Sequence, residues 1–233
     1  MKITKMHVQL IDSMGTDLSV VNAARVSMAK ESEWEGEEEI LDHDGDVMQP
    51  STLRLSAADE KLVCYLATHK HWTPFAHCFA SFRIKAPVFV ARQLAKHQVG
   101  LAWNEVSRRY VDEEPEFWFP TALRERPDGS IKQGSGGVHK NSGPWLEAMD
   151  GTVNCALKLY SMLVQQGIAP EQARMILPLN TMTEWVWSGS LAAWGRVCSL
   201  RLDSHAQVET TEVARSIAGY MASLFPVSWK ALT

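Results

Sequence analysis

The sequence lacks most features of secreted, membrane-spanning and metal-bound proteins. It has only four cysteines, all far apart and without a CxxC pair (Cys64, Cys78, Cys155 and Cys198), which argues against a disulfide framework or a zinc ribbon. The longest stretch without a charged residue, 216–229, is shorter than the roughly 20 residues that span a bilayer. The first residues lack the apolar region of a signal peptide. We therefore expect a soluble, cytoplasmic protein with reduced thiols and no membrane partner.

Common phosphate-binding and metal-binding motifs are also missing. No GxGxxG follows a predicted strand and no GxxxxGK[ST] occurs, so Rossmann-type and P-loop nucleotide binding lack support. The segment 68–78 (THKHWTPFAHC) contains three histidines and a cysteine, but its spacing H-x-H-x5-H-C matches no zinc signature and includes no carboxylate. We predict no metal site there. We interpret Thr73 and Pro74 as a rigid turn that presents a hydroxyl group and His71.

Acidic residues are unevenly distributed along the chain. The 233 residues include 23 basic and 27 acidic side chains, for a net charge of −4. Nine of the acids lie within 31–46, which holds no Lys or Arg, so the other 217 residues carry a net charge of +5. A mildly basic body suits an anionic ligand. The acidic stretch cannot bury itself, so we expect an exposed, mobile insertion over 30–54.

Apolar spacing predicts a mixture of helices and strands. Alternation favours strands over 2–11, 78–86 and 183–188. Helical periodicity favours helices over 18–29, 57–70, 87–97, 146–166, 171–176, 190–200 and 205–224. Asp17 is expected to cap the first of these helices and Ser56, with Asp59 three residues on, the second. The proline- and glycine-rich residues 113–145 should form a long loop. Helices outnumber strands without alternating with them, which predicts the α+β class.

The segment 92–110 (RQLAKHQVGLAWNEVSRRY) concentrates groups that could bind a nucleotide. On a helix, Gln93 shares a face with Lys96 and His97. Guanidinium groups suit phosphate, an amide suits a base edge, and a carboxylate suits a ribose hydroxyl or an imide N–H. The alternative is a solvated, charged helix end in which Glu105 forms a salt bridge with an arginine. For the set as a whole, a binding site is the better interpretation.

A second candidate is LRLDSHAQVE (200–209), where Arg201, His205 and Gln207 lie near a predicted helix start. Helix N-termini attract anions through their free N–H groups. The simpler interpretation is that Asp203 or Ser204 caps the helix, which is compatible with a functional Arg201. Three tryptophans elsewhere are best interpreted as core or interface residues rather than as a platform for a ring cofactor (Trp185, Trp187 and Trp194).

Several motifs, in one order, resemble the flavin-dependent thymidylate synthases (the ThyX family). The stretch ARQLAKHQVGLAWNEVSRRY (91–110) resembles the family pattern ARQxxRHRxxSxNExSxRY. Four further segments resemble the family in the same order: AARVS (23–27), HWTPFAH (71–77), ARMILPLN (173–180) and LRLDSHAQ (200–207). The resemblance covers 15–27 and 57–225.

The chain also departs from this family pattern. Lys96 and Gln98 replace the two arginines of RHR, and Lys96 keeps the charge without the bidentate fork. Eight residues rather than seven separate this motif from Ser107. Ala76 stands where many members have a carboxylate.

The resemblance implies a fold, a reaction and an assembly. It implies a single domain over 1–233, with a mixed central sheet, flanking helices and a helical part, in a homotetramer whose active sites are shared between subunits. The reaction would convert dUMP, methylenetetrahydrofolate and NADPH to dTMP, tetrahydrofolate and NADP, with FAD as the cofactor. Its partners would be these small molecules and not nucleic acid.

The resemblance also implies roles for individual residues. The dUMP-binding set is Gln93, Lys96, Glu105, Ser107, Arg108, Arg109, Arg174 and Arg201. The FAD-contacting set is Ser27, Thr73, Lys96, His97, Gln98, Glu105, Ser190, Arg196 and His205. His71 resembles a histidine on the folate or flavin side. Arg201 resembles the residue that polarises the uracil imide, which makes it the expected catalytic residue.

The residues present favour one way of activating uracil C5. A cysteine that adds to C6 would need a lowered pKa in an electropositive niche. Cys155 and Cys198 lie in apolar helical patterns and are expected to be packing residues. The remaining route is electrostatic, with Arg201 stabilising the developing anion. Ser107 is expected to bind substrate, because an unassisted serine is a weak nucleophile.

Two other hypotheses stay open. The first is a non-catalytic protein that binds nucleotides or single-stranded nucleic acid through the basic stretch 83–109 and its aromatics. The second keeps the fold without the activity, because of Lys96 and Gln98.

Overall fold

The computed structural model describes residues 1–37, 40–41, 47–49, 51–111, 113–127 and 134–233. Its centre is a four-stranded antiparallel sheet in the order β2–β5–β8–β6. These strands are β2 (His7–Met14), β5 (Phe79–Pro87), β8 (Met182–Ser190) and β6 (Leu101–Glu105). β5 and β8 pair along their whole length, from Phe79 with Ser190 to Pro87 with Met182. The predicted α+β class is confirmed.

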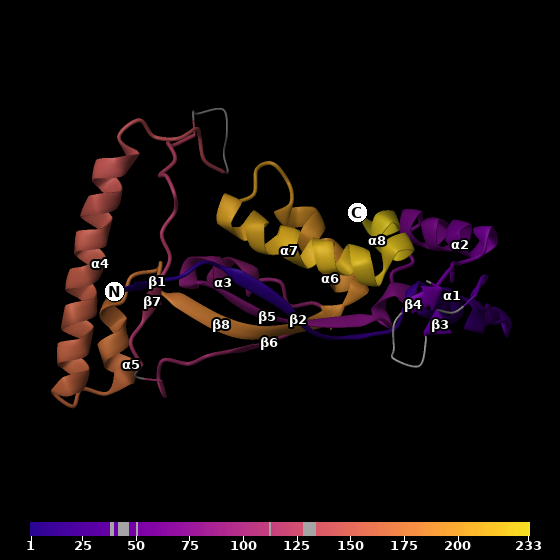
Figure 1. The fold of residues 1–233 in the computed structure, drawn as a ribbon, viewed down its shortest axis with the longest axis horizontal. Helices are drawn as coiled ribbons and strands as arrows, with labels where there is room; N and C mark the ends of the chain where they lie inside the picture. Colours follow the sequence, from indigo (N-terminus) through magenta and orange to yellow (C-terminus); the bar gives the residue numbers. More distant parts are fainter. Residues whose placement is uncertain (38–39, 42–46, 50, 112, 128–133) are drawn as a thin grey trace.

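One face of the sheet carries the main hydrophobic core. Phe82 is paired with Trp187 and Ile84 with Trp185, and all four side chains are buried. Helices lie along this face (Figure 1): α3 (Val88–Leu94), α6 (Leu191–Arg201), α7 (Val208–Leu224) and α8 (Pro226–Leu232). Trp194 of α6 meets Phe82 edge-on, with ring centroids 5.1 Å apart. The prediction that the three tryptophans belong to the core is confirmed.

Two N-terminal helices join this core at one end of the sheet. They are α1 (Asp17–Arg25), followed by the turn η1 (Val26–Met28), and α2 (Ala57–Thr68), followed by the turn η2 (Pro74–Ala76). Ser56 Oγ accepts a hydrogen bond from the Asp59 backbone N–H at 3.1 Å, so the predicted cap of α2 is confirmed. None of the helices in the described ranges has the length and apolar character needed to cross a bilayer.

A long helix stands at the opposite end of the sheet (Figure 1). This helix, α4 (Ser142–Gln165), packs against α5 (Pro170–Ala173) and the turn η3 (Arg174–Ile176). A small second core lies here, built on Phe117, Val153 and Leu157. Next to it β1 (Lys2–Ile3) pairs in parallel with β7 (Glu116–Phe117).

The acidic region is described only in part. Short strands β3 (Ile40–Leu41) and β4 (Val47–Gln49) pair in antiparallel fashion, and Glu35 forms an isolated bridge with Arg54. Ser32 Oγ donates to Asp59 Oδ1 at 3.1 Å, which ties the start of this region to α2. Residues 38–39, 42–46 and 50 lie outside the described residues, so the mobility of 30–54 stays a prediction.

Two capping predictions are wrong, and both errors have a physical reason. Asp17 does not precede α1 but begins it, after Thr16. Its buried carboxylate instead accepts the backbone N–H groups of Val227 and Ser228, at 2.9 and 2.8 Å, and so caps α8. Neither Asp203 nor Ser204 caps α7, which begins at Val208 rather than 205. The residues after α6 form a separate turn, in which Asp203 Oδ1 accepts the His205 N–H at 2.8 Å.

Three further features of the fold were not predicted. The segment Leu101–Glu105 is a strand, β6, although it is only five residues long and ends in two polar residues. The last residues form α8, which begins at Pro226. Cys155 is exposed on α4 rather than packed, because it lies on the side of the helix away from the small core.

Candidate functional site

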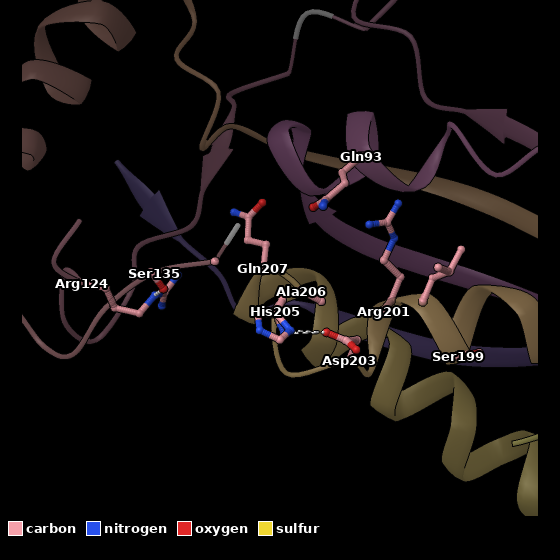
Figure 2. Close-up of a pocket in the computed structure, with 11 residues that line it drawn as sticks. Gln93, Arg124, Ser135, Ser199, Arg201, Asp203, His205, Ala206 and Gln207 are labelled. Atoms are coloured by element: carbon pink, nitrogen blue, oxygen red, sulfur yellow. Dashed lines mark hydrogen bonds and ion pairs between the residues drawn. The ribbon is translucent and has the colours of Figure 1, made fainter. Parts of the chain in front are cut away.

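The main candidate site is a cavity of about 750 Å³ where α3, α6 and α7 meet the segment before α4. Its lining residues come from α3, from α6, from the turn just before α7 and from the segment before α4: Gln93, Arg124, Gly134, Ser135, Ser199, Leu200, Arg201, Asp203, His205, Ala206 and Gln207. In the view of Figure 2, Arg124 and Ser135 lie on one side and Arg201 and Ser199 on the other. Both sequence segments singled out for nucleotide binding therefore contribute to one cavity.

Arg201 is the last residue of α6 and is held in place by His97. Its Nε–H donates to His97 Nε2 at 2.9 Å. Burial, together with the positive charges of Arg201 and Arg196, lowers the pKa of His97 below its ordinary value of 6.5. His97 is therefore neutral near pH 7, and its other ring nitrogen carries the proton. Burial also lowers the pKa of Arg201, but an arginine keeps its charge in proteins.

Residues in the first turn of α7 form hydrogen bonds with two other residues that line the cavity, Gln93 and Arg124. Thr210 Oγ1 donates to Gln93 Oε1 of α3 at 2.6 Å. Glu209, which is buried, accepts a hydrogen bond from Arg124 Nη2 at 2.5 Å, and Arg124 Nε donates to Ser135 Oγ at 2.6 Å. Arg124 was missed at the sequence level. Its only signal is a charge inside a proline- and glycine-rich stretch, whereas its partner lies 85 residues further along the chain.

His205 and Gln207 line the cavity from the turn between α6 and α7. His205 Nδ1 lies 2.9 Å from Asp203 Oδ1, so the carboxylate faces a histidine rather than an arginine. The backbone hydrogen bond from His205 lowers the pKa of Asp203, and the side-chain contact adds to this. Gln207 is the N-cap of α7, without a side-chain capping bond.

A second cavity, of about 730 Å³, lies near η3 and the free end of β6. Three members of the predicted dUMP set line it: Glu105, Arg108 and Arg174. Glu105 Oε1 accepts from Thr183 Oγ1 at 2.7 Å and Oε2 accepts from the Trp103 ring N–H at 3.2 Å. The alternative that pairs Glu105 with an arginine is therefore wrong.

The remaining members of the predicted dUMP set lie nearby or at the surface. Arg109 Nε is 3.6 Å from Glu171 Oε2 beside the second cavity. Ser107 Oγ accepts the Arg109 backbone N–H at 3.3 Å. Lys96 is exposed just after α3. Of the described residues, none lines both cavities. One chain thus divides the predicted set into a group with Gln93 and Arg201 and a group with Arg174.

A third cavity, of about 460 Å³, is more apolar and borders the first at α6. It shares Ser199 and Leu200 with the main cavity. His71, Trp72 and Arg196 are among its lining residues. Arg196 Nη2 donates to the Val99 carbonyl at 2.7 Å, which fixes the guanidinium group beside the loop after α3.

Other members of the predicted FAD set do not line this cavity. Ser190 is buried and caps α6, accepting the Ala193 N–H at 3.3 Å. Thr73 is exposed in the turn before η2, Ser27 is exposed in η1, and Gln98 is exposed after α3. One chain therefore gathers only part of this predicted set.

Thiols and metal ligands are not concentrated at these cavities. Burial raises the pKa of the Cys198 thiol to about 12, and burial with the nearby Asp17 raises that of Cys78 to about 11. Within the described ranges, no group of three or more His, Cys, Asp or Glu side chains could hold a metal ion.

The fold and the first cavity, with Arg124 and Arg201 in its lining, are those of a protein that binds a small molecule. The family model of the thymidylate synthase complementing proteins matches residues 9–227. The chain belongs to this family. It is 31% identical over 233 residues to a flavin-dependent thymidylate synthase of Thermosipho africanus, covering 98% of this chain and 91% of the relative. It is 34% identical to one of Thermus thermophilus, covering 98% and 76%.

A solved structure is also similar to this chain. The UMP/dUMP methylase PolB from Streptomyces cacaoi, bound with 5-Br dUMP, is similar with a TM-score of 0.81 and 28% identity. The similarity covers 99% of this chain and 96% of that one.

Proposed function

We propose that this chain catalyses the reductive methylation of dUMP to dTMP, with methylenetetrahydrofolate as carbon donor and NADPH-reduced FAD as hydride source. Its family and its relatives named flavin-dependent thymidylate synthase support this reaction, and so does the UMP/dUMP methylase. The observation that carries it is the Arg201–His97 pair in a cavity of nucleotide size. The enzyme is a cytoplasmic methyltransferase and flavoprotein of dTMP biosynthesis.

Arg201 is the catalytic residue of this proposal. Its Nε–H donates to His97. Among the described residues, neither of its two terminal nitrogens has a hydrogen-bond partner. Those N–H groups are free to meet the uracil carbonyls. Activating the C5=C6 bond puts negative charge on the base, and a fixed, partly buried guanidinium stabilises that charge. Neutral His97 holds the guanidinium in place.

A cysteine nucleophile is not supported. Cys78 and Cys198 are buried with raised pKa values, so neither is a thiolate near pH 7. Cys64 and Cys155 are exposed, but they line none of the three cavities described. Ser107 meets a backbone N–H rather than a base. We assign it to substrate binding.

The active site is shared between subunits of a homotetramer. This explains why one chain puts Gln93 and Arg201 on one cavity and Arg174 on another. A second subunit would bring its Arg174 group to the Arg201 group of the first, which places additional cations around the nucleotide phosphate. Exposed apolar side chains on α4, such as Trp145 and Met162, are consistent with burial in such an assembly.

The residues of the third cavity fit FAD. A flavin ring needs an apolar or aromatic surface, and its diphosphate needs cations. Trp72, 60% exposed, and His71 supply the first, while Lys70 and Arg196 supply the second. When bound, FAD supplies the hydride chemistry of the reaction. The residues of this chain orient it, and His71 faces the folate or flavin side.

The competing hypotheses are less well supported. The family and its relatives do not favour a non-catalytic nucleotide or single-stranded nucleic-acid binder. Because Lys96 and Gln98 replace two arginines of the family pattern, we expect this change to affect the rate of the reaction. Changing both to Arg should raise activity only modestly if Arg201 and His97 carry the chemistry.

A flavin spectrum followed by an exchange assay tests the proposal. The purified chain should be yellow, and anaerobic NADPH should bleach it. Hydrogen release from uracil C5 should then require both dUMP and reduced flavin. A protein that binds no FAD under any of these conditions would contradict the proposal. Release of the C5 hydrogen without reduced flavin would contradict the assigned mechanism.

A further inference from the structure

One hydrogen bond beside the main cavity joins Gln93 to the first turn of α7. Thr210, in the first turn of α7, is completely buried, and its Oγ1 lies 2.6 Å from Gln93 Oε1. Gln93 is half-buried and lines the cavity. In Figure 2 its side chain extends from α3 into that space. Among the described residues, the Thr210 side chain thus meets the site through Gln93.

The direction of this hydrogen bond follows from burial. A buried hydroxyl group has one proton, and leaving it without an acceptor is costly. In the described part of the chain, Gln93 Oε1 is the only acceptor that meets the Thr210 hydroxyl. Thr210 therefore donates and Gln93 Oε1 accepts. The amide of Gln93 is held in one orientation, with its NH₂ group left for the cavity.

The neighbouring residues keep Thr210 in position. Glu209, one residue earlier, is held by Arg124. Thr211, one residue later, donates its hydroxyl to the Arg201 carbonyl at 2.9 Å. The first turn of α7 is therefore anchored on both sides, so its threonine can impose the orientation of Gln93 rather than follow it.

We propose that Thr210 is a positioning residue that makes Gln93 a hydrogen-bond donor and thereby selects a uracil base over a cytosine base. This inference rests on the proposed function, in which the ligand of the cavity is a pyrimidine nucleoside monophosphate. The cavity then offers N–H donors from both Gln93 and Arg201. Uracil presents a carbonyl oxygen at C4, which accepts. Cytosine presents an amino group there, which would face a donor and leave both groups unpaired.

Equilibrium binding of dUMP and dCMP to the full chain tests the inference. Wild-type protein should prefer dUMP. Thr210→Val is close in shape and removes the hydroxyl, so the amide of Gln93 can turn over. It should weaken dUMP binding roughly 3- to 10-fold and reduce the dUMP-to-dCMP affinity ratio by about 10-fold. Thr210→Ser keeps the hydroxyl and should retain the wild-type ratio. A purely structural role would not change this ratio.

The outcomes separate the inference from the proposed function. Wild-type protein that binds neither nucleotide would overturn the proposed function itself. Wild-type preference for dUMP with an unchanged ratio in Thr210→Val would overturn only the role of Thr210. If Thr210→Val does not fold, Gln93→Glu carries the test. Its second carboxylate oxygen would offer an acceptor, so the preference should move toward dCMP. An unchanged preference in that variant would overturn the inference.

Discussion

Arg201 at the end of α6 donates its Nε–H to Nε2 of His97, 2.9 Å away, although 104 positions separate the two residues. This contact joins the two sequence segments that carry most of the family resemblance. It also fixes the charge states of both partners, because His97 can accept only while it is neutral. The arrangement makes His97 a support for the proposed catalytic cation in addition to its predicted contact with FAD.

The first consequence of this hydrogen bond is that activity and stability should depend on pH. The pKa of His97 is lowered from 6.5, so the neutral form is favoured by the fold. Protonation would remove the acceptor and place a cation against Arg201 and Arg196. Activity and stability from this contact should be present above pH 6.5 and be lost as the pH falls through the lowered pKa. A profile of kcat/KM for dUMP checks this, with His97→Gln as a control.

His97→Gln retains an acceptor but does not titrate in this range. The acid limb assigned to His97 should therefore disappear in this variant. Persistence of an identical limb would show that another group causes it.

The proposed catalytic role of Arg201 predicts a large effect from a conservative change. Arg201→Lys keeps one positive charge but cannot both donate to His97 and present two further nitrogens. Release of the uracil C5 hydrogen should slow by about 10²- to 10³-fold, as when a transition-state donor is removed. The KM for dUMP should change much less. Arg215 lies exposed on α7, and Arg215→Lys should leave both quantities unchanged.

A carboxylate that lines the second cavity should control acid stability. Glu116 on β7 meets Lys2 and Lys85, and Thr4 Oγ1 donates to it at 3.1 Å. Although burial opposes ionisation, these partners lower the pKa of Glu116 from 4.5 to about 2. The stabilisation is present above pH 4.5 and is lost as the pH falls toward 2. Glu116→Gln should therefore lower the free energy of unfolding at neutral pH, on the order of 1–2 kcal/mol because Lys2 is largely exposed.

Urea unfolding at neutral pH and at about pH 3 measures this effect. The difference between wild type and Glu116→Gln should shrink in acid. An equal difference at both values would assign the effect to packing instead of charge.

The cap of α8 gives a prediction about folding alone. Asp17 is buried and accepts two backbone N–H groups of α8. Asp17→Ala would leave both donors unpaired in the core, which should cost about 2–3 kcal/mol in the free energy of unfolding. The exposed Asp12 on β2 is a matched control, and Asp12→Ala should cost much less. Similar losses in the two variants would show that the cap is unimportant.

Local signals predicted most of the helices and the three longest strands, β2, β5 and β8. Ser56 with Asp59 marked the start of α2 correctly, because a capping box acts within one turn. β6 was not predicted, because its pairing with β8 depends on residues 80 to 88 positions away. The cap from Asp17 to α8 was missed for the same reason.

The candidate site was predicted residue by residue but not as an arrangement. Motif order could name Gln93, Arg174 and Arg201 without showing that they face two cavities. Arg124 and Thr210 could not be found from the sequence, because each acts through a contact between distant segments. Spacing along the chain reports which side chains share an element. It does not report which elements meet.

The separation of Arg174 from Arg201 leads to a test of the proposed site shared between subunits. Arg174→Gln and Arg201→Gln should each be nearly inactive alone. If each site takes these arginines from two different subunits, co-expressed tetramers of both variants should regain about a quarter of wild-type activity per site, because that fraction of sites receives two intact residues. Tetramers that mix Arg201→Gln with Arg201→Lys should regain none. Mixed oligomers that form but stay inactive would place both arginines in one subunit's site.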